Sequence, residues 1–318
     1  MGTVLTALGL IIGFALLIKG SDIFVDASVN IARKLEIPNV VIGLTIVTLG
    51  TGAPEIVISV SAAIGGSSDM AVGNIVGSNI LNLMLILGLC ALIKPIAIKL
   101  KEIVRDHMIG TGSAVLLLVL KIVFSEVIPR LGSFVLLSLF AVYMTHLVRQ
   151  ALKNRGAENS RHDLDATKNI SIAKSILLVV LGIIIIVAGG QLAVTNAVSI
   201  AFAIGMTERV VGLTILAIGT SLPELVTSIT ACKKGESDIA IGNVIGSSIF
   251  NILFILGITG VIMPLAIDHN LIFDLIFLVV GSLVFLPFAY TGKKISRTEG
   301  LLMVVAYVVY MVFVTTNT

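Results

Sequence analysis

The chain has 318 residues, of which 57% are hydrophobic and 12% are charged, and its formal net charge is +3. This small number of charged residues cannot cover the surface of a soluble fold of this size. The composition therefore excludes a soluble protein and indicates one that crosses a membrane several times. The small net charge gives no support to nucleic-acid binding.

The sequence contains about ten segments that are apolar enough to cross a bilayer, which takes roughly 20 residues each. They lie near residues 3–31, 38–64, 70–93, 103–124, 128–149, 171–203, 208–232, 238–263, 269–290 and 298–315. We therefore predict an all-α polytopic membrane protein, surrounded by the lipid bilayer.

Lys and Arg residues are distributed unevenly over the connections between these helices. One set of connections holds 17 of the 21 Lys and Arg residues, and the other set holds three. Positive residues accumulate on the cytoplasmic side of a membrane protein. The sequence therefore predicts a multi-pass protein of the plasma membrane with both termini outside the cytoplasm.

The first predicted helix carries three charged residues towards its cytoplasmic end, Lys19, Asp22 and Asp26. They lie on neighbouring turns, a spacing that permits local pairing. We expect a structural ion pair here in preference to a role in transport.

One stretch of the sequence occurs twice. Residues 43–98 and 212–267 align without gaps at a constant offset of 169 residues, with 28 identities in 56 positions. The identities fall on polar and helix-breaking residues: GT, PE and S in the first helix of each copy, and GN, GS and N in the second. Lipid-facing helices do not need such residues, so we expect the functional site at these positions.

The first helix of the first copy should be broken near Pro54. Proline has no N–H and its ring crowds the carbonyl of Gly50, so the helix should open around residues 48–53. A second helix then restarts with Pro54 in its first turn and Glu55 beside it, near the positive end of the helix dipole. An ionisable residue inside a membrane is a functional site by default, so Glu55 is the first candidate ligand.

Asn74, Ser78 and Asn82 recur every four residues in the next helix and therefore share one face. We expect Ser78 and Asn82 to ligate a cation, together with their counterparts Ser247 and Asn251. Asn74 could ligate a cation or hydrogen-bond between helices, and the sequence leaves both possibilities open.

The second copy repeats the plan with Pro223 and Glu224. An odd number of predicted spans separates equivalent positions, so the two copies should cross the membrane in opposite directions, as in the inverted repeats of secondary transporters. Glu55 and Glu224 should then face each other near the bilayer midplane. Two carboxylates among hydroxyl, amide and carbonyl oxygens form a hard site, which suits Ca²⁺ better than Mg²⁺.

A polar, mixed-charge segment at residues 151–170 separates the two copies and is too short for a folded domain. We therefore predict a first five-helix half at residues 1–150, a cytoplasmic linker at 151–170 and a second, inverted five-helix half at 171–318.

These motifs resemble those of the cation/calcium antiporters, and within that superfamily the sodium/calcium exchangers of prokaryotic type. GT(S/G)xPE and GNxxGSxxxN each occur twice, and the resemblance covers nearly the whole chain. It implies one calcium position, several sodium positions, three Na⁺ carried for each Ca²⁺, and a mobile pair formed by the first and sixth spans.

Carried over by motif, the resemblance also implies a set of ion-site residues. Calcium would be held by Glu55 and Glu224 with Thr51 and Thr220; sodium ligands would include the Thr48 and Ala217 carbonyls, Ser78, Ser247 and Ser221; Asn82 and Asn251 would line the centre.

Departures from related patterns narrow the choice of coupling ion. Proton-coupled members resemble GNxxE where this chain has Gly77 and Gly246, which argues against proton coupling. Potassium-dependent members look as if they carry Asp where this chain has Asn251, which argues against potassium coupling.

The two copies differ at one predicted ligand, because Gly52 stands where the second copy has Ser221. One side-chain sodium ligand is then missing from the first copy. Adding a hydroxyl at residue 52 should strengthen sodium binding, unless glycine is needed there for the helix break or for close packing.

We interpret the chain as a secondary active antiporter that exchanges Na⁺ for Ca²⁺ by alternating access, with net movement of charge. Proton- or potassium-coupled exchange is one alternative, and a cation channel, whose ligands would have to release ions rapidly, is another. An intramembrane enzyme would need a nucleophile and base or a metal triad, and the sequence shows neither. We expect no enzymatic activity, no cofactor and no protein partner, with Ca²⁺ and Na⁺ as substrates.

Overall fold

The computed structural model describes residues 2–98, 100–125, 127–153, 170–206, 217–267, 271–290 and 293–317. Most of the predicted linker, residues 154–169, and the start of the second repeat copy, residues 212–216, lie outside the described residues. The division of the chain at residues 150 and 170 therefore stays a prediction.

Eight described helices are long and apolar enough to cross a membrane: Leu5–Leu35, Ser68–Ile93, Ile103–Phe124, Arg130–Lys153, Ile172–Ala203, Ser237–Ile262, Leu271–Phe288 and Arg297–Thr316. A further span is broken, because Asn39–Thr51 and Ala53–Ile64 meet at an angle of 49°. The prediction of an all-α polytopic membrane protein is confirmed, and ten spans are compatible with these helices.

The elements of the first half begin and end as follows: α1 (Gly2–Leu35), α2 (Asn39–Ile42), the π-helix η1 (Gly43–Val47), α3 (Thr48–Thr51), α4 (Ala53–Ile64), α5 (Ser68–Ile80), the π-helix η2 (Leu81–Ile86), α6 (Leu87–Ile93), β1 (Ile96–Ala97), α7 (Leu100–Phe124), β2 (Val127–Ile128) and α8 (Arg130–Lys153). Those of the second half are α9 (Ile172–Ala203), α11 (Ala217–Thr220), α12 (Leu222–Lys233), α13 (Ser237–Ile249), the π-helix η4 (Phe250–Ile255), α14 (Leu256–Ile262), β3 (Leu265–Ala266), α15 (Leu271–Tyr290), β4 (Lys294–Ile295) and α16 (Arg297–Asn317). From α3 to β1 and from α11 to β3, every boundary recurs at the offset of 169 residues seen in the sequence.

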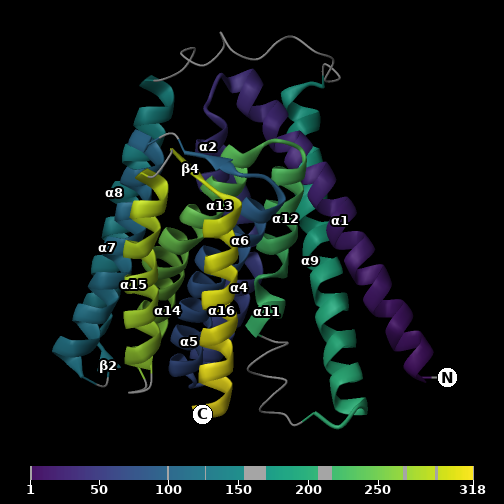
Figure 1. Cartoon of the computed structure of the whole chain (residues 1–318). Coiled ribbons are helices and arrows are strands. Elements are labelled where there is room, and N and C mark those ends of the chain that lie inside the picture. The colour runs from purple at the N-terminus through teal and green to yellow at the C-terminus, as the bar shows by residue number, and fades with distance from the viewer. Residues whose placement is uncertain are drawn as a thin grey trace.

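Two short strand pairs show how the halves are related. β1 pairs with β4 and β2 pairs with β3, both antiparallel, so each pair joins one half to the other. β1 and β3 are equivalent in the repeat, yet the pair containing β4 lies near the top of the bundle and the pair containing β2 near the bottom (Figure 1). Equivalent strands at opposite ends are what two inverted copies require. Both chain termini lie at the bottom end (Figure 1).

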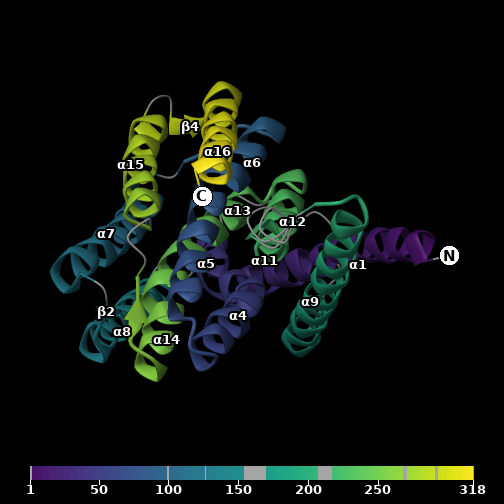
Figure 2. The same ribbon diagram turned by 90° about the horizontal axis from the view of Figure 1, so that it is seen from below.

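α1 and α9 run side by side along one flank of the bundle (Figures 1 and 2). A Cβ added at Gly13 would lie 2.6 Å from the backbone nitrogen of Ala193, and one added at Gly182 would lie 2.8 Å from Cβ of Phe24. These two contacts are equivalent under the offset, so the repeat extends to α1 and α9. Small residues let membrane helices approach closely, and the two helices therefore form one tightly packed pair.

The second of the two spans in each repeat copy, α5–α6 in the first copy and α13–α14 in the second, forms the centre of the molecule. In the most apolar part of α5–α6, 78% of the residues are buried, and in α13–α14 72% are buried, compared with 22% in α16. α7, α8, α15 and α16 surround this centre on the flanks away from α1 and α9 (Figure 2). The polar residues whose spacing is repeated in the two copies thus lie in the most buried helices.

Candidate ion-binding site

The two helix breaks place both glutamates as predicted. α4 begins at Ala53 and α12 at Leu222, with a proline as the second residue of each, so Glu55 and Glu224 lie in first turns. The opening is narrower than predicted: α3 remains helical to Thr51, and a single residue separates it from α4. Pro54 has no N–H, so the helical hydrogen bond that residue 54 would donate is lost. Because only one residue separates α3 from α4, the loss of helical hydrogen bonding is confined to this short step.

The two carboxyl groups are brought together between the halves. Glu55 is 1% exposed and Glu224 is 2% exposed. Ser221 Oγ lies 3.4 Å from Glu55 Oε1 and donates to it, and Glu224 is in electrostatic range of Glu55. Glu55 is therefore contacted by a hydroxyl group from the opposite half, and the two carboxyl groups lie near each other.

Four buried oxygens of the predicted site residues have no hydrogen-bond partner among the described residues: Glu55 Oε2, Glu224 Oε2, Asn82 Oδ1 and Ser247 Oγ. Leaving such groups buried and unpaired costs free energy. A hard cation takes several oxygen ligands of these kinds, so the unpaired oxygens fit a bound ion. The described residues hold no cluster of three or more His, Cys, Asp or Glu side chains, so neutral oxygens would have to complete the coordination.

The hydroxyl residues link the broken helices to their neighbours. Ser221 Oγ is 3.1 Å from Ser78 Oγ on α5. Ser78 and Ser247 are each 2% exposed. Ser78 thus joins Ser221 and Glu55 in one connected group.

The predicted carbonyl ligands differ between the copies. The Thr48 carbonyl accepts a helical hydrogen bond from the Gly52 N–H at 2.9 Å. At the equivalent place, the Ser221 N–H donates to the Ile218 carbonyl at 3.1 Å, one residue beyond Ala217, where α11 begins. The backbone at the second break is therefore wound more tightly than at the first. The Ser221 N–H bonds to the Ile218 carbonyl in place of the helical bond to the Ala217 carbonyl.

Asn74 and its counterpart Asn243 make equivalent bonds across the halves. Thr51 Oγ1 donates to Asn243 Oδ1 at 3.3 Å, and the half-buried Thr220 donates to Asn74 Oδ1 at 3.4 Å. These contacts join a broken helix of one half to a central helix of the other. They favour the interhelical interpretation of Asn74.

Asn82 and Asn251 are buried in the π-helices η2 and η4. π-Helical turns are frequent at functional sites, and the sequence carries no recognisable sign of them. Asn251 Nδ2 donates to Asn79 Oδ1 at 3.0 Å. Asn79 is a residue that sequence reasoning missed; the available signal is its difference from its counterpart, Ser248.

The surroundings of Gly52 favour close packing as the reason for the glycine. A Cβ at this position would lie 3.0 Å from the Thr48 carbonyl oxygen and 3.2 Å from the ring of Phe250. The position equivalent to Phe250 in the repeat is Leu81. The larger side chain, Phe250 of the second copy, therefore lies against the position in the first copy that lacks the hydroxyl.

The aspartates of α1 have a different partner from the local one expected. Lys234 Nζ, directly after α12, lies 2.6 Å from Asp26 and 3.4 Å from Asp22. Ser21 of α1 also hydrogen-bonds with Thr227 of α12 at 3.2 Å. The expected structural ion pair is present, but its cation is Lys234 and not a residue of α1, because the tertiary structure brings the end of α12 onto α1.

Residues 5–149 and 174–316 match the family model described as sodium/calcium exchanger protein. The chain is 38% identical over 312 residues to the putative antiporter CaxA of Alkalimonas amylolytica, which covers 94% of this chain and 95% of that protein. It is 34% identical over 344 residues to the sodium/calcium exchanger MaX1 of Methanosarcina acetivorans, covering 95% of this chain and 96% of that protein.

Solved structures of the sodium-calcium exchanger NCX_Mj share the fold. The one soaked with zero Na⁺ and Ca²⁺ has a TM-score of 0.85 and 32% sequence identity, covering 98% of this chain and 99% of that one. The match extends over both halves and therefore includes both helix breaks. The chain is a multi-pass membrane protein and belongs to the sodium/calcium exchanger family.

Proposed function

We propose that this protein exchanges Na⁺ for Ca²⁺ across the membrane by alternating access. The observation that carries the proposal is the pair of buried glutamates, which lie in electrostatic range of each other and each have one oxygen without a partner among the described residues, with Ser221 of the opposite half donating to Glu55. MaX1 and NCX_Mj, which are similar over nearly the whole chain, are named as exchangers of these two ions.

Competition for the two carboxylates couples the ion movements. One Ca²⁺ neutralises both glutamates, with Thr51 and Thr220 as further ligands. Na⁺ ions use the same carboxylates together with Ser78, Ser221, Ser247 and the Thr48 and Ala217 carbonyls, while Asn82 and Asn251 line the centre. The two ions cannot occupy the site together, so each enters only after the other has left.

Access alternates through movement of α1 and α9 against the central helices. Their close packing at Gly13 and Gly182 makes them a single unit. Both border α12, through Ser21 on α1 and through the backbone contacts of α9. A sliding movement of this pair would open the site to one side at a time.

The orientation follows from charge. We propose that the end of the bundle bearing α12's Lys233 and Lys234 is cytoplasmic and that both termini lie outside, in the plasma membrane. This orientation is supported by the connections at that end, which hold most of the Lys and Arg residues of the chain.

Transport by purified protein in proteoliposomes tests the function. Calcium uptake should require internal Na⁺, and it should not be supported by a proton or potassium gradient when Na⁺ is absent. Uptake without any internal counter-ion would indicate a channel, and uptake driven by protons or K⁺ would replace Na⁺ as the coupling ion.

Exchange should also respond to voltage. Three Na⁺ on two carboxylates leave one positive charge, whereas one Ca²⁺ leaves none, so each cycle moves charge. A membrane potential contributes roughly 2.3 kcal/mol per 100 mV for each charge moved. A potassium diffusion potential set with valinomycin should therefore change the initial rate; an unchanged rate would exclude this loading scheme.

A further inference from the structure

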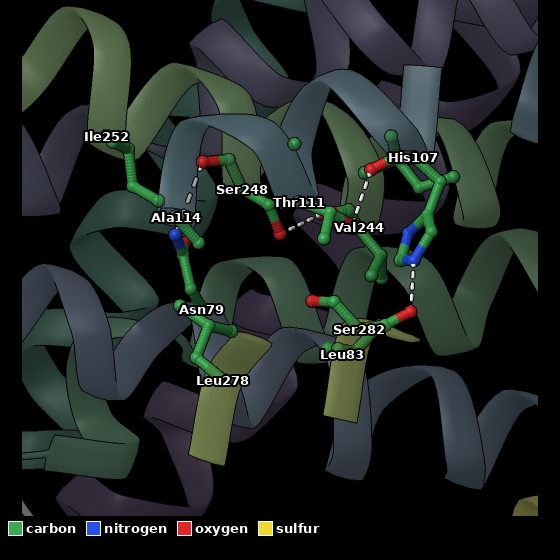
Figure 3. Close-up of a pocket in the computed structure, with 12 residues that line it drawn as sticks. Asn79, Leu83, His107, Thr111, Ala114, Val244, Ser248, Ile252, Leu278 and Ser282 are labelled. Atoms are coloured by element: carbon green, nitrogen blue, oxygen red, sulfur yellow. Dashed lines mark hydrogen bonds between the residues drawn. The ribbon is translucent and has the colours of Figure 1, made fainter. Parts of the chain in front are cut away.

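Asn79 connects the central helices of the two halves. Its side chain is fully buried on α5. Asn79 Nδ2 donates to the backbone carbonyl of Ser248 on α13 at 3.2 Å, as the dashed line in Figure 3 shows. Its other end, Oδ1, accepts from Asn251 Nδ2 on η4 at 3.0 Å.

These two hydrogen bonds fix the orientation of the Asn79 side-chain amide and, through it, that of the Asn251 side-chain amide. A backbone carbonyl can only accept, so the amide nitrogen of Asn79 must face Ser248 and its oxygen must face Asn251. That oxygen can only accept as well, so Asn251 must offer its nitrogen. The oxygen of Asn251 therefore lies on the side of its amide turned away from Asn79.

Among the described residues, the equivalent residue in the other copy, Ser248, does not connect the two halves through its side chain. Ser248 Oγ donates to the Val244 carbonyl of its own helix at 3.1 Å. Both amide atoms of Asn82, the counterpart of Asn251, lack a hydrogen-bond partner within the described part of the chain. Of the two central asparagines, Asn251 is oriented by a hydrogen bond, whereas no hydrogen bond from the described residues orients Asn82.

Asn79 also borders a small cavity of about 10 Å³, which it shares with His107, Thr111 and Ser282 (Figure 3). That space holds about one water molecule. None of the described lining residues is acidic, and His107 is bonded to the Ser282 carbonyl at 2.8 Å. The cavity therefore offers no second cation site, and the polar contact of Asn79 that reaches the ion-binding residues is the one to Asn251.

We propose that Asn79 is a positioning residue that holds the Asn251 amide with its oxygen available to the transported cations. The centre of the site then presents one amide oxygen that is oriented by a hydrogen bond, that of Asn251, and one that is not, that of Asn82. This inference rests on the proposed exchange of Na⁺ for Ca²⁺, which the unmodified protein tests first: absence of exchange there rejects the function, whereas the variants below address Asn79 alone.

The direct test is Asn79→Ser, which introduces the residue found at the equivalent position of the other half and removes both hydrogen bonds of the Asn79 side-chain amide. We expect the concentrations of Na⁺ and Ca²⁺ needed for half-maximal exchange to rise about fivefold, the size of one lost oriented hydrogen bond, with the maximal rate changed less than twofold. Ser248→Ala removes a hydroxyl at the matched position and should leave both concentrations unchanged. Equal half-saturation in Asn79→Ser and the unmodified protein would overturn the proposal.

A second background separates positioning from packing. In Asn251→Asp, the side chain has an oxygen at each end, so it needs no orientation. Adding Asn79→Ser to Asn251→Asp should cause no further loss, and it should relieve repulsion between the Asn79 oxygen and the carboxylate. The same fivefold loss in both backgrounds would show a merely structural role and overturn the proposal. Should the serine variant fold poorly, Asn79→Leu keeps the volume and carries the same expectations.

Discussion

The two copies of the repeat share one framework but differ at their contacts. Both have a broken helix with proline in second position, a glutamate beside it and a π-helix around the central asparagine. Three of the positions at which they differ concern the site and its surroundings: the first copy has Gly52, Asn79 and Gly65 where the second has Ser221, Ser248 and Lys234. The shared features supply charge and helix geometry. In the proposed exchange, the differences decide how each half would hold sodium, how its central amide is oriented and how it contacts α1.

The comparison shows that duplication does not make the site symmetric. The hydroxyl of Ser221 joins Glu55 to Ser78, whereas the ring of Phe250 lies beside Gly52. Substitutions that exchange residues between the copies therefore test which differences matter.

The largest effect should come from the feature that both copies share. Glu55→Gln and Glu224→Gln each remove a buried charge that no neighbouring hydroxyl replaces, so we expect a loss of exchange of at least about a hundredfold. Sodium-dependent calcium uptake in proteoliposomes measures it. The exposed Glu36, substituted in the same way, should retain full activity, and substantial transport by either site variant would rule out the proposed ligands.

The next effect concerns Gly52. Gly52→Ser alone should impair the response to both ions, because the new Cβ would press on Phe250 and the Thr48 carbonyl, and overpacking costs about 1–3 kcal/mol. Combining it with Phe250→Leu gives positions 52 and 250 the residues found at the equivalent positions, Ser221 and Leu81. We expect the double variant to regain activity and to need less Na⁺ for half-maximal exchange.

Phe250→Leu alone is the control for that experiment, since it changes packing without adding a ligand. Strong sodium activation in Gly52→Ser without the second change would show that Phe250 does not restrict this position.

Ser221→Gly makes the second copy resemble the first. Its hydroxyl contacts Glu55 Oε1 and Ser78 Oγ, so its loss should raise the Na⁺ concentration for half-maximal exchange about fivefold. Calcium affinity should change less than twofold, because the carboxylates provide most of its coordination charge. Ser221→Ala separates loss of the hydroxyl from added backbone freedom, and an unaltered sodium response in both variants would mean that Ser221 is not a ligand.

The smallest effect should come from Lys234. Its ion pairs with Asp22 and Asp26 tie α12 to α1 at one end only, since the equivalent residue is Gly65. Exposed ion pairs contribute about 0.2–1 kcal/mol, so Lys234→Gln should favour opening at that end and shift half-saturation there at most about threefold. Inside-out and right-side-out vesicles distinguish the two sides, and Lys233→Gln is the charge-matched control. Equal shifts on both sides would contradict a contact that acts on one opening.

Much of the site could be predicted because its determinants are local. A proline in an apolar segment removes a helical hydrogen bond and favours a break, and a glutamate in such a segment is costly and therefore indicates a functional site. The duplicated spacing therefore located both breaks and both glutamates, and the recurrence of every boundary from α3 to β1 at the same offset confirms the repeat.

Only the tertiary structure decided which side chains meet. The bonds of Thr51 to Asn243, Ser221 to Glu55 and Asn251 to Asn79 join residues that are far apart in the chain. The pairing of Lys234 with α1 is of the same kind. Helical periodicity fixes the face on which a residue lies, but it contains no information about which helix of the other half covers that face. The sequence by itself thus determined the candidate ligands and their helices, and the packing of the two inverted halves determined their partners.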